Sequence, residues 1–190
     1  RWYAAAFVLR CSPLNRALAH KGTALKFARK FECSSFVFTP IETGDAVYLL
    51  TAVSSDLFPK SLPLAKIKTL NQAEDWCSDR ASDWNMDKCY VWSCRRLANS
   101  QVIGQVTLFP QKNRLALAYW VNPEFWGQGL ATQMCKALLS HVCSSGYQGN
   151  IWAGVHSWNS RSSSVLKKLG FEQIVSNSEN TTEYSLEIVC

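Results

Sequence analysis

Charged residues are scarce in this chain of 190 residues: Asp, Glu, Lys and Arg together make up 18% of it. The chain also has no long low-complexity run, and its apolar residue types reach 47%. A disordered protein would show the opposite balance, with high charge and few residues able to form a core. The length is that of one domain of ordinary size. We therefore expect a single globular domain.

Acidic residues are absent from the first thirty positions, which hold seven Lys or Arg residues. Thirteen basic and fourteen acidic residues remain, so the net charge of +6 comes from this segment and the rest is near neutral. A nucleic-acid-binding domain would carry a basic face on its folded body. A basic tail alone does not indicate such a face, so we expect no nucleic-acid partner.

The chain lacks an early methionine and a long apolar run. Met86 is the first methionine, and the apolar run at residues 3–9 is far shorter than the roughly 18 residues that cross a bilayer. No membrane association is therefore expected.

The sequence SPLNRALA at residues 12–19 resembles the translated recombination site of a mobile gene cassette. We interpret residues 1–24 as a basic tail that could be non-native read-through, and residues 25–190 as the domain.

The eight cysteines form no CxxC pair, and no histidine stands near Cys89 and Cys94 to complete a zinc set. Cys135 and Cys143 fall within a helical apolar pattern, where cysteine acts as a small hydrophobic residue. We therefore expect no metal site. Because the cysteines form no recognisable disulfide or metal pattern, we also expect them to be reduced and the protein to be cytoplasmic.

Hydrophobic spacing, caps and turn residues predict a mixed α/β sheet in one domain. Helices are expected near residues 43–53, 70–83, 130–144 and 159–169. Strands are expected near residues 36–39, 89–94, 101–109, 115–121, 150–155, 171–175 and 183–189. The three consecutive strands before residue 122 are predicted to form an antiparallel meander, with the third buried on both faces.

The stretch WGQGLAT at residues 126–132 lies between an apolar strand and a helix. A helix N-terminus leaves N–H groups unpaired and favours anions, and glycines let a phosphate approach the backbone. No GxxxxGK(S/T) stretch occurs, which excludes a P-loop. A dinucleotide site would need a third glycine where Thr132 stands. The pattern Q/R-x-x-G-x-G/A of acetyltransferase pyrophosphate loops fits Gly129 and Ala131, with Trp126 in its first position. A plain strand-to-helix turn is the alternative.

Two ordered segments carry a resemblance to a known family. YWVNPEFWGQGLAT at residues 119–132 resembles the strand, loop and helix of the GCN5-related N-acetyltransferases (GNAT), in the Rim-type branch that acetylates ribosomal-protein N-termini. Residues 159–171 match the N-x-x-S-x-x-V-L-x-K-x-G-F segment of that branch. Gly104 stands where the family's second strand carries a glycine. The resemblance covers about residues 31–190 and implies a GNAT fold, with about seven mostly antiparallel strands flanked by about four helices.

The resemblance also implies that acetyl-CoA is the co-substrate. In this family the strand before the loop splays from its neighbour and binds the pantetheine arm through its backbone, while the loop amides hold the pyrophosphate. The cofactor-binding residues implied are Tyr119, Trp120, Val121, Trp126, Gly127, Gln128, Gly129, Leu130, Ala131, Thr132, Asn159 and Ser162. Asn159 is also a fitting helix N-cap, and Ser162 an ordinary surface residue.

Attack of an amine on a thioester needs an oxyanion donor, a base and an acid for the leaving thiolate. The family implies a backbone N–H near Val121 as the oxyanion donor and Ser162 as the proton donor. The Glu that relatives often carry on the strand before the loop is Ala116 here. His156 is our candidate base because it follows a buried strand, and a water chain is the alternative.

We therefore predict an N-acetyltransferase that moves acetyl from acetyl-CoA to a primary amine, of a protein N-terminus or a small molecule, in a ternary complex. Its partner is the amine acceptor, and relatives are often monomers or homodimers. The alternatives are a non-catalytic acyl-CoA sensor or scaffold, which Ala116 favours, and an interaction module with no cofactor.

Overall fold

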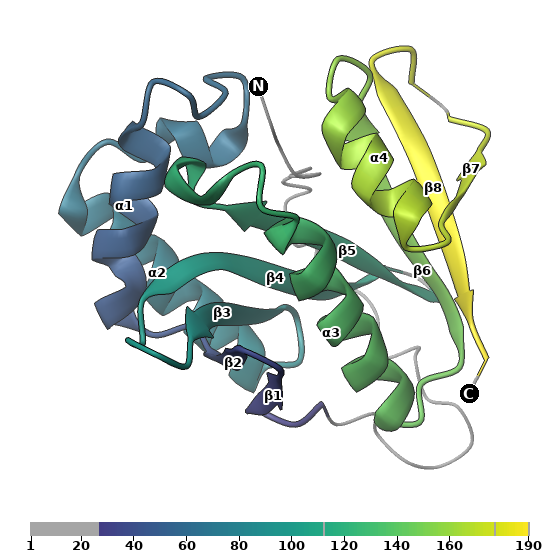
Figure 1. The fold of residues 1–190 in the computed structure, drawn as a ribbon, viewed down its shortest axis with the longest axis horizontal. Coiled ribbons are helices and arrows are strands. Elements are labelled where there is room, and N and C mark those ends of the chain that lie inside the picture. The colour runs from purple at the N-terminus through teal and green to yellow at the C-terminus, as the bar shows by residue number, and fades with distance from the viewer. Residues whose placement is uncertain (1–26, 112, 177, 190) are drawn as a thin grey trace.

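The structure is a computed structural model that describes residues 27–111, 113–176 and 178–189. The predicted tail at residues 1–24 lies outside the described residues. The described chain forms one sheet of eight strands in the order β1-β2-β3-β4-β5-β6-β8-β7. Every neighbouring pair is antiparallel except β5 and β6, which are parallel. The prediction of a mixed, mostly antiparallel sheet is confirmed (Figure 1).

The strands are β1 (Phe31–Cys33), β2 (Phe36–Pro40), β3 (Tyr90–Arg96), β4 (Val102–Gln111), β5 (Arg114–Val121), β6 (Gly149–His156), β7 (Glu172–Ile174) and β8 (Thr181–Ile188). The helices are α1 (Ala46–Ser54), α2 (Leu70–Asn85), α3 (Leu130–Ser144) and α4 (Ser160–Lys168). Short 3₁₀ turns occupy Thr43–Asp45, Pro63–Lys66 and Pro123–Phe125. The antiparallel meander of β3, β4 and β5 is confirmed, and β5 is buried along most of its length.

Side chains that alternate along β4 show that helices cover both faces of the sheet. A Cβ added to Gly104 would meet the side chain of Met134 in α3. The next residue, Gln105, points to the opposite face, where its amide contacts Ser93 and through it Asp45, just before α1. In Figure 1, α3 and α4 lie beside each other. Helices α1 and α2 pack with each other and against β4 and β3.

Local signals set the ends of the helices. The side chain of Thr69 accepts from the backbone N–H of Gln72, whose own side chain reaches back, so a capping box begins α2. Asn159 accepts from the backbone N–H of Ser162 at 3.2 Å and caps α4. Gly146 and Gly170 follow α3 and α4 with φ of 77° and 87°. Glycine takes this left-handed conformation at little cost, so each helix ends where the sequence predicts.

Strand β1 is the element that the sequence analysis did not predict. It has only three residues, too few for a periodic pattern. Its position depends on tertiary contacts, because the ring of Phe31 stacks on Phe38 of β2 at 4.5 Å and on His141 of α3 at 4.2 Å. Aromatic packing thus adds an eighth strand to the predicted seven.

No helix of the described residues is long and apolar enough to cross a membrane. Those residues also contain no group of three or more His, Cys, Asp or Glu that could hold a metal ion. Cys33, Cys77, Cys94 and Cys135 are free thiols. Cys143 is disulfide-bonded, so the prediction of reduced cysteines is wrong at that residue.

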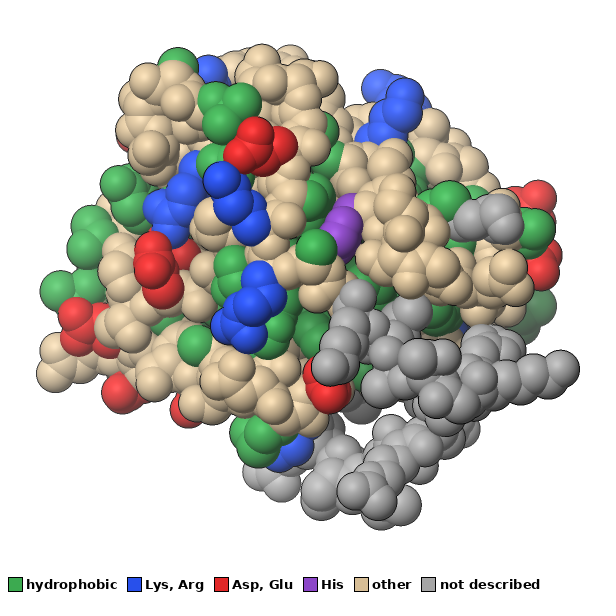
Figure 2. Space-filling model, turned by 90° about the horizontal axis from the view of Figure 1, so that it is seen from below, with side chains coloured by type: hydrophobic (Ala, Val, Ile, Leu, Met, Phe, Trp, Pro, Cys, Tyr) green, Lys and Arg blue, Asp and Glu red, His purple; other side chains and the backbone are tan. Residues whose placement is uncertain are grey.

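The described surface carries charges of both signs. On the face shown in Figure 2, Lys and Arg side chains gather near the middle, with Asp and Glu side chains and scattered hydrophobic ones around them.

Candidate active site

The parallel pair β5 and β6 separates after a short stretch of pairing. Its register contains only Leu115 opposite Ile151 and Ala116 opposite Trp152. Strand β5 nevertheless continues to Val121, and β6 to His156. The last residues of β5 therefore present one backbone edge to a gap, as the resemblance implied.

The antiparallel pairing with β4 identifies which backbone groups face this gap. Val121 lies opposite Gly104, and the N–H of the next residue, Asn122, donates to the Ile103 carbonyl at 2.8 Å. Residues in an antiparallel ladder alternate between bonding toward the partner and away from it. The N–H and C=O groups of Val121 and Tyr119 therefore point away from β4, toward the side of β6.

One of these groups already has a protein partner. The indole Nε1–H of Trp126 donates to the Val121 carbonyl oxygen at 2.8 Å. The polar side chain that the motif places in the first position is thus replaced by an indole that binds the end of β5. The N–H of Val121, rather than its carbonyl, is left as the group of this residue that could serve a ligand.

Gly127 and Gly129 shape the loop between β5 and α3. Their φ angles are 81° and 71°, in the left-handed region that favours glycine. Gly129 is the N-cap of α3 and provides no side-chain cap for its first turn. A Cβ at Gly127 would have no atom within 4 Å. Open space therefore borders the loop at Gly127, and the N-terminus of α3, which has no side-chain cap, favours an anion.

Gly104 allows β4, β5 and α3 to approach closely beside this loop. A Cβ at this position would lie 2.2 Å from the Trp120 carbonyl oxygen and 3.0 Å from the Met134 methyl group. Any larger residue would displace the end of β5. The need for glycine at this position is therefore explained by close contact rather than by its φ angle.

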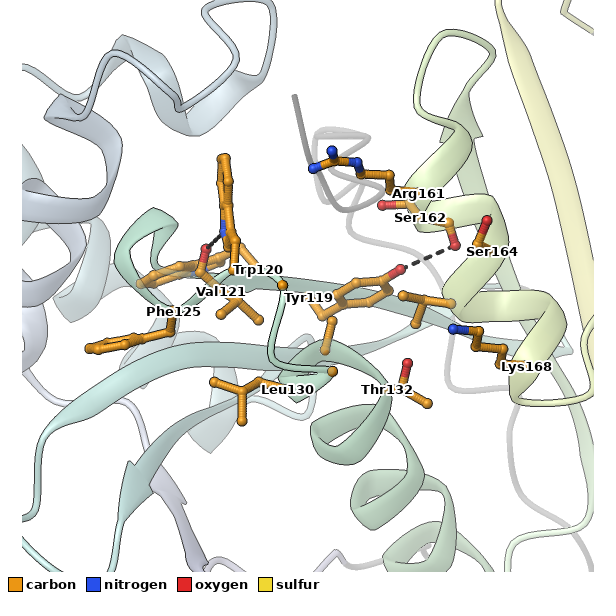
Figure 3. Close-up of a pocket in the computed structure, with 15 residues that line it drawn as sticks. Tyr119, Trp120, Val121, Phe125, Leu130, Thr132, Arg161, Ser162, Ser164 and Lys168 are labelled. Carbon is orange, nitrogen blue, oxygen red and sulfur yellow. Dashed lines mark hydrogen bonds between the residues drawn. The ribbon is translucent and has the colours of Figure 1, made fainter.

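A cavity of about 360 Å³ joins the gap, the glycine loop and α4. Figure 3 shows β5 and the loop on one side and α4 on the other. The residues that line it are Tyr119, Trp120, Val121, Phe125, Trp126, Gly127, Gly129, Leu130, Ala131, Thr132, Arg161, Ser162, Ser164, Val165 and Lys168. Ten of the twelve residues predicted to bind the cofactor are among them. Gln128 and Asn159 are not.

The two predicted residues outside the lining lie next to it. Gln128 is exposed, and its Oε1 accepts from Arg96 at 3.5 Å. Asn159 is 2% exposed. Its Oδ1 caps α4, whereas its Nδ2 is buried without a hydrogen-bond partner among the described residues. An unpartnered buried amide is costly and is an expected place for a missing ligand.

Tyr119 connects β5 to α4 across the cavity. Its phenol donates to the backbone carbonyl oxygen of Ser162 at 3.4 Å, the contact dashed in Figure 3. Burial raises the pKa of the Tyr119 phenol far above its usual range, so this group is protonated at neutral pH. Ser162 is buried beside it, near the N-terminus of α4.

His156 does not line the cavity. It ends β6, and its ring stacks on Trp158 with centroids 5.5 Å apart and an interplanar angle of 10°. Trp158 is half exposed, so the pair lies at the surface. The role of His156 as a base stays a prediction.

Four α4 residues on the cavity wall, together with Phe125, were missed by sequence reasoning. Arg161, Ser164, Val165 and Lys168 follow one another at the i, i+3, i+4 and i+7 spacing of a single helix face. That spacing was readable in the sequence once Ser162 was considered part of the site. The two cations make this wall attractive to an anionic ligand.

Comparison with known proteins agrees with this geometry. The family model described as an acetyltransferase (GNAT) domain matches residues 36–172. The uncharacterized N-acetyltransferase YoaA of Bacillus subtilis (strain 168) is 24% identical over 145 residues, which cover 75% of this chain and 82% of that protein.

Two similar solved structures are Rim-type enzymes. RimL, a ribosomal-protein alpha-N-acetyltransferase in complex with coenzyme A, has a TM-score of 0.72 at 13% identity, covering 82% of this chain and 96% of RimL. Mycobacterium smegmatis RimJ in complex with CoA-disulfide has a TM-score of 0.66 at 17% identity, covering 80% of this chain and 81% of RimJ. The chain belongs to the acetyltransferase (GNAT) domain family and is an acetyl-CoA-dependent acyltransferase.

Proposed function

We propose that this protein transfers the acetyl group of acetyl-CoA to a primary amine by direct attack in a ternary complex. The observation that carries the proposal is the single cavity that joins the splayed edge of β5, the glycine loop and α4. A protein N-terminus is the preferred acceptor class, because the structural relative RimL is named for this activity. A small-molecule amine is the alternative acceptor.

The residues present fit the two ends of acetyl-CoA. The N–H groups of the loop and first turn of α3, from Gly127 to Thr132, would hold the pyrophosphate. The edge of β5 at Tyr119 would bind the pantetheine arm as a further strand would, which leaves the Val121 N–H for the reacting carbonyl. The buried, unpartnered Nδ2 of Asn159 supports a role as a donor to a pantetheine carbonyl.

Chain groups at the end of β5 and the start of α4 would serve the chemical step. The amine nitrogen bonds to the thioester carbon, the C–S bond breaks, and the amine loses a proton. The Val121 N–H would stabilise the oxyanion. Ser162 would give a proton to the leaving thiolate, and Tyr119 holds this serine through its backbone carbonyl.

The acceptor proton needs a route out of the site. The position where the resemblance leads us to expect a Glu is Ala116, which is fully buried in β5. The chain therefore offers no carboxylate at this point of the strand. His156 at the end of β6 is the candidate base, acting through water because it does not line the cavity. Acceptors of low pKa, such as protein N-termini, make the smallest demand on a base.

Replacing Ser162 by Ala tests the proton donor. We expect kcat to fall about 100-fold, the lower end of general acid–base contributions, with the KM for acetyl-CoA little changed. The measurement is thiol release from acetyl-CoA with a panel of N-terminal peptides and small amines. Ser163→Ala is the matched control, since Ser163 lies on the same turn but outside the cavity lining. An unchanged kcat in Ser162→Ala contradicts the assigned role.

The same assay separates the proposal from a non-catalytic acyl-CoA sensor or scaffold. Such a protein would bind acetyl-CoA and release no thiol with any amine. The absence of a carboxylate at Ala116 is the feature that favours this second function.

A further inference from the structure

A chain of buried side-chain hydrogen bonds runs from the end of β5 toward α1. The Trp120 Nε1–H donates to Gln105 Oε1 at 2.9 Å. The Gln105 Nε2–H donates to Ser93 Oγ at 3.3 Å, and the Ser93 hydroxyl donates to Asp45 Oδ2 at 2.6 Å. The chain thus crosses β5, β4 and β3 and ends on a carboxylate.

An ion pair fixes the far end of this chain. Asp45 is 1% exposed, and its other oxygen, Oδ1, pairs with the Arg95 guanidinium. Arg95 in turn donates to Thr39 Oγ1 at 3.2 Å and pairs with the exposed Glu42 at 3.0 Å. A buried carboxylate is stable only when charge and hydrogen bonds compensate it. Both oxygens of Asp45 are bonded, so this carboxylate holds the far end of the hydrogen-bond chain in place.

The four members of the chain are fully packed. Ser93, Gln105 and Trp120 are 0%, 1% and 5% exposed. None of their atoms is among the buried side-chain atoms that lack a partner in the described residues. Buried polar networks with every member satisfied select one arrangement and make it rigid. A network of this kind fixes the indole of Trp120 in one place.

Trp120 connects this network to the reacting groups. It lies between Tyr119 and Val121, whose backbone groups face the gap. Its indole lies on the face of the sheet that also carries the side chains of Gln105 and Ser93. Next to Gln105, Gly104 lets β4 approach the Trp120 carbonyl closely. The network therefore holds the end of β5 from behind.

We propose that Gln105 is a positioning residue for acetyl transfer: by fixing Trp120 it sets the place of the Val121 N–H at the oxyanion. This inference rests on the proposed function. A displacement of about 1 Å in a reacting group can lower the rate about 100-fold. The pyrophosphate loop, α4 and the backbone of Tyr119 would bind the other parts of the cofactor, so its affinity depends little on the place of the Val121 N–H.

The test replaces Gln105 by Met, which keeps the length of the side chain and removes the amide. We expect kcat for acetyl transfer to fall at least tenfold, with the KM for acetyl-CoA within twofold of wild type. Gln111→Met is the matched control. Gln111 lies at the other end of β4 and accepts from Arg114 at 3.4 Å, so this variant should keep kcat within twofold.

A double-mutant cycle adds a readout that a general loss of stability would not move. Trp120→Phe removes the donor of the same hydrogen bond, so the double variant should be no slower than the slower single variant. Independent, multiplicative losses would overturn the proposal. If Gln105→Met does not fold, Ser93→Ala decides, since it breaks the network further from β5 and should lower kcat at least threefold with unchanged KM.

Failure of this inference is distinguishable from failure of the proposed function. If wild type releases no thiol with any amine, the proposed function fails. If wild type is active and Gln105→Met keeps both kcat and KM, the positioning role alone is wrong. A rise in KM with constant kcat would also overturn it, because it would place Gln105 in cofactor binding.

Discussion

At the residue scale, Gly127 and Gly129 give the loop before α3 its shape. Both adopt a left-handed φ, and Gly127 faces open space. The sequence identified this pair because two glycines between a strand and a helix form a recognisable pattern. It could not identify Gln105, because the hydrogen bonds of this side chain join residues on three different strands.

Replacing Gly127 by Val should abolish the binding of acetyl-CoA, because the side chain would occupy part of the cavity that Gly127 lines. A β-branched residue with φ of 81° should also cost about 1–2 kcal/mol of unfolding free energy. Gly146→Val is the matched control, since Gly146 has φ of 77° and equally open surroundings but follows α3. Calorimetric titration with acetyl-CoA should show affinity lost in the first variant and kept in the second. Equal affinity in both would refute the loop's role.

At the scale of helices and strands, the sequence patterns predicted the fold well, since all four helices and seven of the strands lie near their expected positions. Strong periodicity, caps and glycine stops made this possible. The sequence could not predict that β5 and β6 separate after two paired positions, because strand pairing depends on tertiary packing that no local pattern records. It also missed β1, which is held by ring stacking on α3.

The contact between β1 and α3 predicts a dependence of stability on pH. Burial against Phe31 and other aromatic rings lowers the pKa of His141, outweighing a hydrogen bond to the Ala28 backbone. Its Nε2 is buried without a partner in the described residues. The folded state therefore disfavours the charged imidazole, whereas the unfolded chain binds a proton near pH 6.5.

The unfolding free energy should therefore be unaffected by His141 above that pH and should fall as the pH drops from about 6.5 to 5. His141→Phe keeps the stacking and removes the titration, so its unfolding free energy should fall less over the same range. Urea unfolding at pH 7, 6 and 5 measures both proteins. Parallel decreases in the two proteins would show that His141 does not cause the loss.

The whole molecule combines a sheet that opens at one end with a helix that covers the opening. Because β5 and β6 diverge, α4 and the loop before α3 enclose a cavity rather than a continuous core. The fold class was predictable because two family motifs occur in order along the chain, one from β5 to α3 and one across α4. The acceptor was not, since the surface beyond the cavity carries no sequence pattern.

The most direct test of the account is the melting temperature of the protein with and without millimolar acetyl-CoA. A ligand that binds only the folded state adds about 2.7 kcal/mol at 100 times its dissociation constant. That increment should raise the midpoint by several degrees for a domain of 190 residues. A clear rise, absent in Gly127→Val, is the predicted result. No rise in a sample shown to be folded would contradict the cofactor site and, with it, the proposed transfer.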